Sequence, residues 1–307
     1  MAVYVNTNYS ALQGQRYLGN VQNSLTTTYQ RLSSGMRINS AKDDAAGLQI
    51  ADRLTSQING LNQGNRNASD GIALAQTIES GMDEISGMLQ KVRTLAVQAS
   101  NGTNTTEDRA SLAKEASALV AEMQRISQQT TYGGKKILAG GEKTKNGTTL
   151  YGTAGKGSAG GTVVLQVGSN KGDTISFCVA NLAFSVVTVG FTKGFAQNGN
   201  KEASKGASVK FSTAAMAQEL IQTMDSLIAK VDGQRASLGA IQNRLESSIR
   251  NQSNVAANEA DARSRIRDAD FAEESANLSQ QSIIQQAAAS MLMQANTRPQ
   301  LGLSLLG

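Results

Sequence analysis

The sequence contains no histidine, no tryptophan and a single cysteine. Without histidine, the chain lacks the most common general base of enzymes and the most common transition-metal ligand. Cys178 cannot form a disulfide within the chain, and its apolar, strand-like surroundings favour a packed side chain over a nucleophile. No other group of residues forms a catalytic or metal-binding pattern. The sequence therefore predicts a protein that is not an enzyme and that needs no cofactor.

Large apolar residues are also scarce. Aromatic residues make up 4% and hydrophobic residues 39% of the 307 residues. Such a chain is too poor in bulky side chains for one thick core, but it suits long, thin helical bundles with Ala, Leu, Ile and Met along the seams. The one proline, Pro299, lies near the C-terminus, where we expect it to end a helix.

Signals for membranes and nucleic acids are missing as well. No run of about 20 apolar residues is present, and the first residues lack the pattern of a secretory signal peptide. The net charge is +5, but Lys and Arg neither cluster nor alternate with aromatic residues. We therefore expect no membrane insertion and no nucleic-acid binding. Taken alone, these absences favour a cytoplasmic protein, although an export machine that reads no cleavable signal stays open.

Apolar residues recur at alternating steps of three and four in two zones, residues 1–130 and 212–298. The stripes run through residues 51–61, 78–99, 112–126 and 220–245. A period of about 3.5 residues is typical of helices that pack side by side at shallow angles. The sequence therefore predicts a mainly α fold, a discontinuous, coiled-coil-like bundle of long helices from both chain ends.

The middle of the chain has a different composition, rich in Gly, Val and Thr. Two runs of β-forming residues flank a turn at residues 168–173, which predicts a β-hairpin over about residues 162–179. Residues 181–190 are a candidate third strand, and we expect the rest of residues 141–206 to form loops.

The two chain ends carry thinner apolar stripes. An isolated helix with so little apolar surface to bury is marginal in water, so we expect these ends to be mobile in the monomer and to order against a partner. The stripe residues are therefore candidates for a polymer interface: Leu18, Val21, Leu25 and Leu32 near the N-terminus, and Leu278, Ile284 and Met291 near the C-terminus.

Charge also distinguishes the ends. Residues 1–42 hold four basic side chains and no acid, whereas residues 268–307 hold four acids and one base. Opposite charge favours pairing of the termini, within a chain or between chains, so Arg31, Arg37, Asp268 and Asp270 join the interface candidates. The acids also suit a helix N-terminus, and both roles can hold. Separately, Ser40 followed by Asp43 is typical of a helix start.

Several segments resemble bacterial flagellin, the filament protein of the flagellum. Together they cover both chain ends and more than two-thirds of the chain. They are LSSGMRINSAKDDAAGL (residues 32–48), NRNASDGI (65–72), LQKVRTLAVQ (89–98), RIRDADFA (265–272), QANTRPQ (294–300) and the leucine-rich terminus at 303–306.

The resemblance implies an architecture and a function. Residues 1–43 and 267–307 would form terminal helices of the inner filament core, disordered in the monomer. Residues 44–140 and 207–266 would form a helical rod domain. Residues 141–206 would hold the hairpin and loops, with little or no outer variable domain. Polymerisation into an extracellular flagellar filament that serves motility is then expected; the alternative is a low-copy hook–filament junction protein with related terminal helices.

The resemblance also implies partners. Flagellins leave the cell through the flagellar type III export channel with a chaperone on the C-terminal helix, and in the filament they meet cap and hook-junction proteins. A Toll-like innate immune receptor of hosts reads many flagellins, and the matching positions are Lys91, Leu95 and Glu115. Lysine stands at position 91 where the family usually has arginine, which keeps the charge but loses the planar fork of donors.

Overall fold

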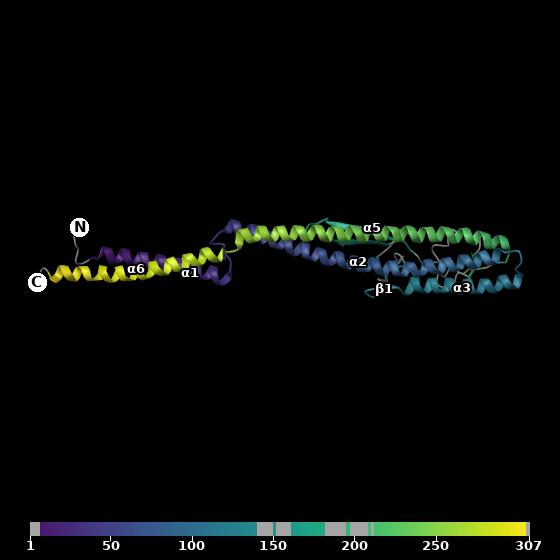
Figure 1. Cartoon of the computed structure of the whole chain (residues 1–307), viewed down its shortest axis with the longest axis horizontal. Helices are drawn as coiled ribbons and strands as arrows, with labels where there is room; N and C mark the ends of the chain where they lie inside the picture. The colour runs from purple at the N-terminus through teal and green to yellow at the C-terminus, as the bar shows by residue number, and fades with distance from the viewer. Residues whose placement is uncertain are drawn as a thin grey trace. The chain divides into compact units, whose positions relative to one another are not determined.

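The computed structural model describes residues 7–139, 150–151, 161–181, 195–196, 208–209 and 212–304. Most of these residues lie in long helices: α1 (Tyr9–Ser34), α2 (Ala45–Ser100), α3 (Thr106–Gln129), α5 (Ala214–Arg267) and α6 (Phe271–Ser304). Short strands pair antiparallel between α3 and α5: β1 (Thr131–Tyr132) with β2 (Lys135–Lys136), β3 (Gly161–Gln166) with β4 (Thr174–Val179), and β5 (Phe195–Ala196) with β6 (Ser208–Val209). Figure 1 shows that both ends of the chain form long helices, which confirms the predicted mainly α fold.

The chain divides into two compact units, residues 1–59 with 255–307 and residues 60–254. We call them the terminal unit and the central unit. Because α2 and α5 run past these boundaries, each helix contributes residues to both units. The domain limits that the resemblance implies, at residues 43 and 267, stay a prediction.

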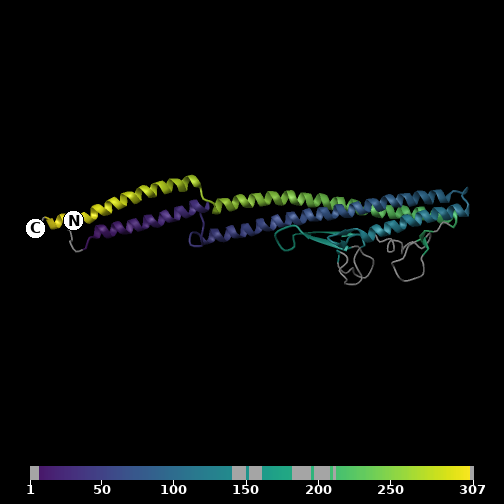
Figure 2. The same ribbon diagram turned by 90° about the horizontal axis from the view of Figure 1, so that it is seen from below.

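The core of the central unit is the seam that the heptads predicted. In Figures 1 and 2, α2, α3 and α5 run side by side along this unit. The stripe of α2 between residues 78 and 99 is buried throughout, as is the stripe of α5 between 220 and 245 apart from Gln234. The α3 stripe is buried or half-buried. The sustained period of 3.5 residues therefore identified the packed faces correctly.

The predicted β-hairpin is confirmed. Strands β3 and β4 pair from Gly161 opposite Val179 to Gln166 opposite Thr174. The hairpin packs closely on α2, because a Cβ atom at Gly64 would overlap the backbone carbonyl oxygen of Val167. Nearby, the Asn67 amide nitrogen donates a hydrogen bond to the Gln166 carbonyl at 2.9 Å. Glycine on α2 therefore leaves the space into which the hairpin fits.

Other parts of the middle segment differ from the expected loops. Phe195 in β5 pairs with Val209 in β6, which is buried against α3. The Val209 amide donates to the Ser117 hydroxyl oxygen at 3.0 Å, so a polar contact fixes this short strand pair. Before this segment, within residues 44–140, β1 and β2 form a further pair, whose turn contains Gly133 and Gly134 with φ of 56° and 78°. A Gly-Gly pair is typical of a two-residue hairpin turn, and the predictions from the sequence did not include this one. Residues 182–190, the candidate third strand, lie outside the described residues.

Cys178 is exposed, which corrects the expectation of a packed side chain. Side chains alternate between the two faces of a strand. In β4, Phe177 and Val179 are buried, so Cys178 between them points outward.

The prediction that Ser40 begins a helix is wrong. The Asp43 carboxylate accepts hydrogen bonds from the Asn39 and Ser40 amides at 3.1 and 2.9 Å and closes a turn. These bonds lower the pKa of Asp43, with the Ser40 amide contributing most. Helix α2 begins at Ala45, and the Asp44 carboxylate accepts the Gly47 amide at 2.9 Å. The capping side chain is therefore Asp44, because the helix begins only after the turn.

The expected helix end at Pro299 is also wrong, because α6 continues to Ser304. A proline in a helix removes one hydrogen bond, the one to the carbonyl four residues earlier. That carbonyl belongs to Ala295, and it accepts instead from the Asn8 side chain at 2.8 Å. A partner from outside the helix thus offsets part of the cost of the proline.

Candidate functional site

Helices α1 and α6 pair antiparallel and form the main contact of the terminal unit (Figure 1). At one end Arg31 donates to the Glu274 carboxylate at 3.0 Å. One turn earlier on α1, the buried Thr28 hydroxyl donates to the Gln281 side-chain oxygen at 3.3 Å. Polar contacts thus occupy part of the seam between α1 and α6.

The predicted stripe on α1 faces different environments along its length. Leu25 is buried, and the stripe residues Leu18, Val21 and Leu32 are half-buried. Thr28, between Leu25 and Leu32, is buried as well, so polar and apolar residues share the seam.

On α6 the structure separates the predicted residues. Leu278 is half-buried, whereas the side chains of Ile284 and Met291 are 42% and 71% exposed. Sequence reasoning missed Leu292, which reaches Gly14 of α1: a Cβ on Gly14 would lie 3.1 Å from Leu292 Cδ1. Leu292 lies two heptads after Leu278, but glutamines stand between them, so the apolar pattern is not continuous in the sequence.

The charged candidates take two kinds of role. Arg31 pairs with Glu274, whose side chain is only 8% exposed, and not with Asp268 or Asp270. The Asp270 carboxylate accepts the amide of Ala272 at 2.9 Å and so caps the start of α6. Charge pairing between the termini and acid placement at a helix N-terminus therefore operate together.

Arg37 and Asp268 lie where the chain passes between helices. The Arg37 guanidinium donates to the Ile266 carbonyl at 2.9 Å, near the C-terminal end of α5, where a positive charge is favourable. Its backbone amide donates to the Arg267 carbonyl at 2.7 Å. Asp268 forms a backbone bridge with Met36. These contacts hold the segment after α1 against the segment before α6.

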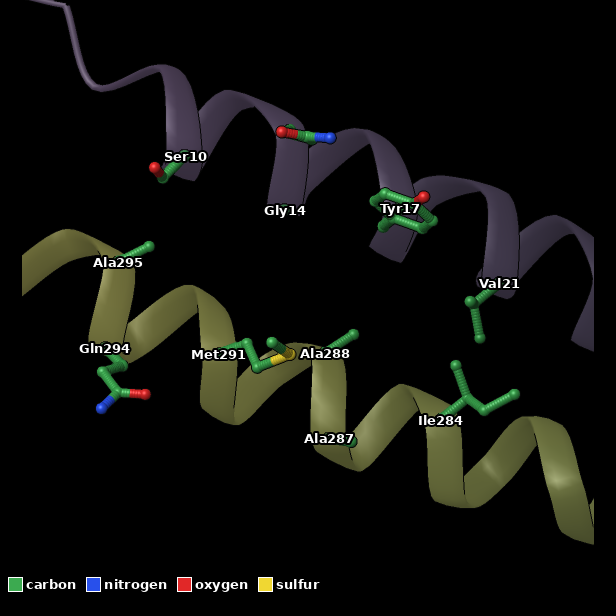
Figure 3. A pocket seen from close by; sticks show the side chains of 11 residues that line it. Ser10, Gly14, Tyr17, Val21, Ile284, Ala287, Ala288, Met291, Gln294 and Ala295 are labelled. Atoms are coloured by element: carbon green, nitrogen blue, oxygen red, sulfur yellow. The ribbon is translucent and has the colours of Figure 1, made fainter. Parts of the chain in front are cut away.

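An apolar groove of 620 Å³ lies between α1 and α6 (Figure 3). Small residues such as Gly14 and Ala288 line its floor and sides, and Val21 and Ile284 point toward each other across it. Met291 also lines the groove, although it is largely exposed. A groove lined by small and apolar side chains can receive apolar side chains from another molecule.

Exposed apolar side chains gather in the terminal unit. Among the described residues, the large exposed hydrophobics of the central unit are Val97 and Val164. All the others belong to the terminal unit: Tyr9, Leu12, Tyr17, Tyr29, Ile50, Val255, Phe271, Ile283, Ile284, Met291 and Met293. A concentration of large exposed apolar side chains in one part of a molecule favours association with another molecule.

The remaining candidates lie on the central unit. Lys91 and Leu95 lie on α2 and Glu115 on α3; Lys91 and Glu115 are exposed, and Leu95 is half-buried against the core. Because α2 and α3 are joined by a short loop, and Lys91 and Glu115 lie equally far from it, the two side chains are level along the helix pair.

The part of the chain that the structure describes contains no helix apolar and long enough to cross a membrane. Within the same residues, no three His, Cys, Asp or Glu side chains come close enough together to hold a metal ion.

Two family models and several known proteins match the chain. Residues 5–143 match the family described as bacterial flagellin N-terminal helical region, and residues 221–306 match bacterial flagellin C-terminal helical region. The chain is 36% identical to Flagellin B of Vibrio cholerae and 35% identical to Flagellin D of Vibrio anguillarum, over alignments of 376 and 379 residues that cover all of each chain. The crystal structure of Bacillus cereus flagellin is 26% identical with a TM-score of 0.46, over 63% of this chain and 94% of that one. The chain therefore belongs to the bacterial flagellin family, a family of structural proteins, not enzymes, whose members form the extracellular flagellar filament.

Proposed function

We propose that this chain polymerises through α1 and α6 into the extracellular filament of a bacterial flagellum, which serves motility. The observation that carries the proposal is the concentration of exposed apolar side chains in the terminal unit. Fully burying one such side chain contributes about 1.5–3 kcal/mol. Several of them buried against neighbouring subunits would offset the conformational entropy lost when the helices order.

In this proposal the apolar stripe residues of α1 and α6 act together: Leu18, Val21, Leu25, Leu32, Leu278, Ile284 and Met291. The half-buried members join α1 to α6, and the exposed Ile284 and Met291 remain available to a second subunit. Domain limits at residues 43 and 267 fit the same proposal. Residues 1–43 and 267–307 would order on assembly, and residues 44–140 and 207–266 would form a preformed rod.

Export and recognition extend the proposal. The free chain leaves the cell through the flagellar type III channel, with a chaperone on α6, and meets the filament cap and hook-junction proteins outside. A host Toll-like receptor would bind the monomer through Lys91, Leu95 and Glu115. The accessibility of Lys91 and Glu115 and their level positions on α2 and α3 support this assignment.

Seeded assembly tests the main proposal. Purified monomer is added to short filament seeds and the product is imaged by electron microscopy. We expect long filaments from the intact chain, and none after removal of residues 1–42 or 268–307. Intact protein that stays monomeric under all salting-out conditions would overturn the proposal and favour the low-copy junction protein.

A pair of point variants tests the groove. Met291→Lys places a charge on the groove, and Val164→Lys places the same charge on an exposed residue of the central unit. Because a buried unpaired charge is costly, we expect Met291→Lys to raise the critical concentration for assembly at least about tenfold. Val164→Lys should change it by less than about twofold. Equal effects of the two variants would remove the groove from the assembly surface.

A further inference from the structure

Asn8 makes two contacts at once. Its side-chain oxygen accepts the Ala11 amide at 3.1 Å and so caps the start of α1. Its side-chain nitrogen donates to the Ala295 carbonyl oxygen in α6 at 2.8 Å. One short side chain therefore joins the beginning of α1 to a specific backbone position near the end of α6.

The Ala295 carbonyl is available because of Pro299. In an α-helix each carbonyl accepts the amide of the residue four positions later. For Ala295 that residue is Pro299, which has no amide hydrogen. Because the half-buried Ala295 carbonyl has no donor within the helix, the gap in the α6 ladder creates an acceptor at this residue. Pro299 therefore leaves the Ala295 carbonyl without a donor from α6, and the Asn8 side chain donates the hydrogen bond instead.

Other contacts along the seam also bear on the register of the two helices. Near Asn8, Leu292 of α6 packs against Gly14 of α1, where a Cβ would lie 3.1 Å from Leu292 Cδ1. At the far end, Arg31 and Glu274 pair through long side chains, which tolerate small displacements. A single polar contact inside a helix pair is a known means of selecting one register.

We propose that Asn8 and Pro299 together form a register lock that positions α1 on α6. The inference rests on the proposed function, because one register aligns the groove residues Val21 and Ile284 on the two helices. Asn8 is a positioning residue for assembly: it sets which α1–α6 arrangement is presented to a neighbouring subunit.

Asn8→Asp separates the two roles of the side chain. Aspartate keeps the capping oxygen but removes the N–H donor and turns an oxygen toward the Ala295 carbonyl. We expect the critical concentration for assembly to rise roughly 2- to 10-fold, the range that one lost hydrogen bond gives. The matched control is Asn251→Asp, the same change at an exposed residue of α5 in the central unit, which should behave like the original chain.

A double-mutant cycle connects Asn8 to the proline. Pro299→Ala restores an amide that can donate to the Ala295 carbonyl within α6. In that background the carbonyl keeps a partner when Asn8 is changed, so Asn8→Asp should have a clearly smaller effect. Equal effects of Asn8→Asp in both backgrounds would contradict the lock.

A disulfide reports the register directly. Ideal Cβ positions at Gly14 and Leu292 lie 3.9 Å apart, within the disulfide range of about 3.5–4.5 Å. In a Cys178→Ser background, Gly14→Cys with Leu292→Cys should form an intrachain disulfide in filaments, and adding Asn8→Asp should lower its yield. Unchanged yield, with Asn8→Asp assembling like Asn251→Asp, would overturn the lock. Failure of the original chain to polymerise would instead overturn the proposed function.

Discussion

Replacing Gly64 with alanine tests how closely the hairpin packs on α2. The new Cβ would lie 2.7 Å from the carbonyl carbon of Val167 and closer still to its oxygen, and both are backbone atoms. Non-bonded heavy atoms settle at about 3.5–4.0 Å, so the hairpin must retreat by about 1 Å. That movement would stretch the 2.9 Å hydrogen bond from Asn67 to the Gln166 carbonyl beyond bonding distance.

The magnitude follows from three terms. Loss of the Asn67 hydrogen bond costs about 1 kcal/mol. Partial exposure of Val167, which is buried, costs about 1–2 kcal/mol. Replacing glycine with alanine inside a helix stabilises the helix by about 1 kcal/mol. The net loss of stability in the central unit is therefore about 1–2 kcal/mol, which lowers its melting temperature by about 2–8 °C.

Gly87→Ala is the matched control. Gly87 also lies inside α2, but a Cβ there meets no atom within 4 Å. Only the gain in helix propensity remains, so we expect a rise of about 2–4 °C. Thermal unfolding of the monomer, followed by circular dichroism at the helix band, measures both variants. An increase in melting temperature for Gly64→Ala would refute the close packing of the hairpin on α2.

Three further predictions concern both units. Arg31→Ala leaves the Glu274 carboxylate, 8% exposed, without its cation, so the critical concentration for assembly should rise more than for Glu274→Gln. Hydrogen bonds from the Thr105 hydroxyl and amide lower the pKa of Asp108. This cap therefore stabilises α3 at pH values above the ordinary carboxyl pKa of 3.8, and the stabilisation is lost as the pH falls below that value. Thr105→Ala should raise the pKa of Asp108 in an NMR titration and weaken the dependence of α3 stability on acid pH. Met82→Ala, at a fully buried position, should lower the unfolding free energy of the central unit by about 2–5 kcal/mol in urea, whereas an exposed substitution should change it little.

The central unit was the most predictable part of the molecule. Its stripes on α2 and α5 are long and unbroken, and a period of 3.5 residues sustained over several turns admits few alternatives to helices with a packed seam. The hairpin was equally clear, because two runs of β-forming residues flank a glycine-containing turn. Local pattern and tertiary packing favour the same structure in these segments.

The terminal unit was less predictable, because its seam mixes polar and apolar residues. On α6, the residues Ile284 and Met291 are adjacent to the face that packs on α1, and only the path of α1 decided which apolar residues are covered. Leu292 escaped notice because glutamines interrupt its stripe. Sequence spacing alone does not assign a face when a helix is apolar on more than one side.

The amino-acid sequence by itself determined the helical class, the seam of the central unit, the hairpin and the family, since each depends on local periodicity or on ordered motifs. Tertiary structure alone decided the partners of groups far apart in the chain. Arg31 meets Glu274 and not Asp270, and Asn8 meets Ala295. The physical reason is that such pairs depend on the register of two helices, which is set by contacts between segments far apart in the chain, among them the contact from Asn8 to Ala295.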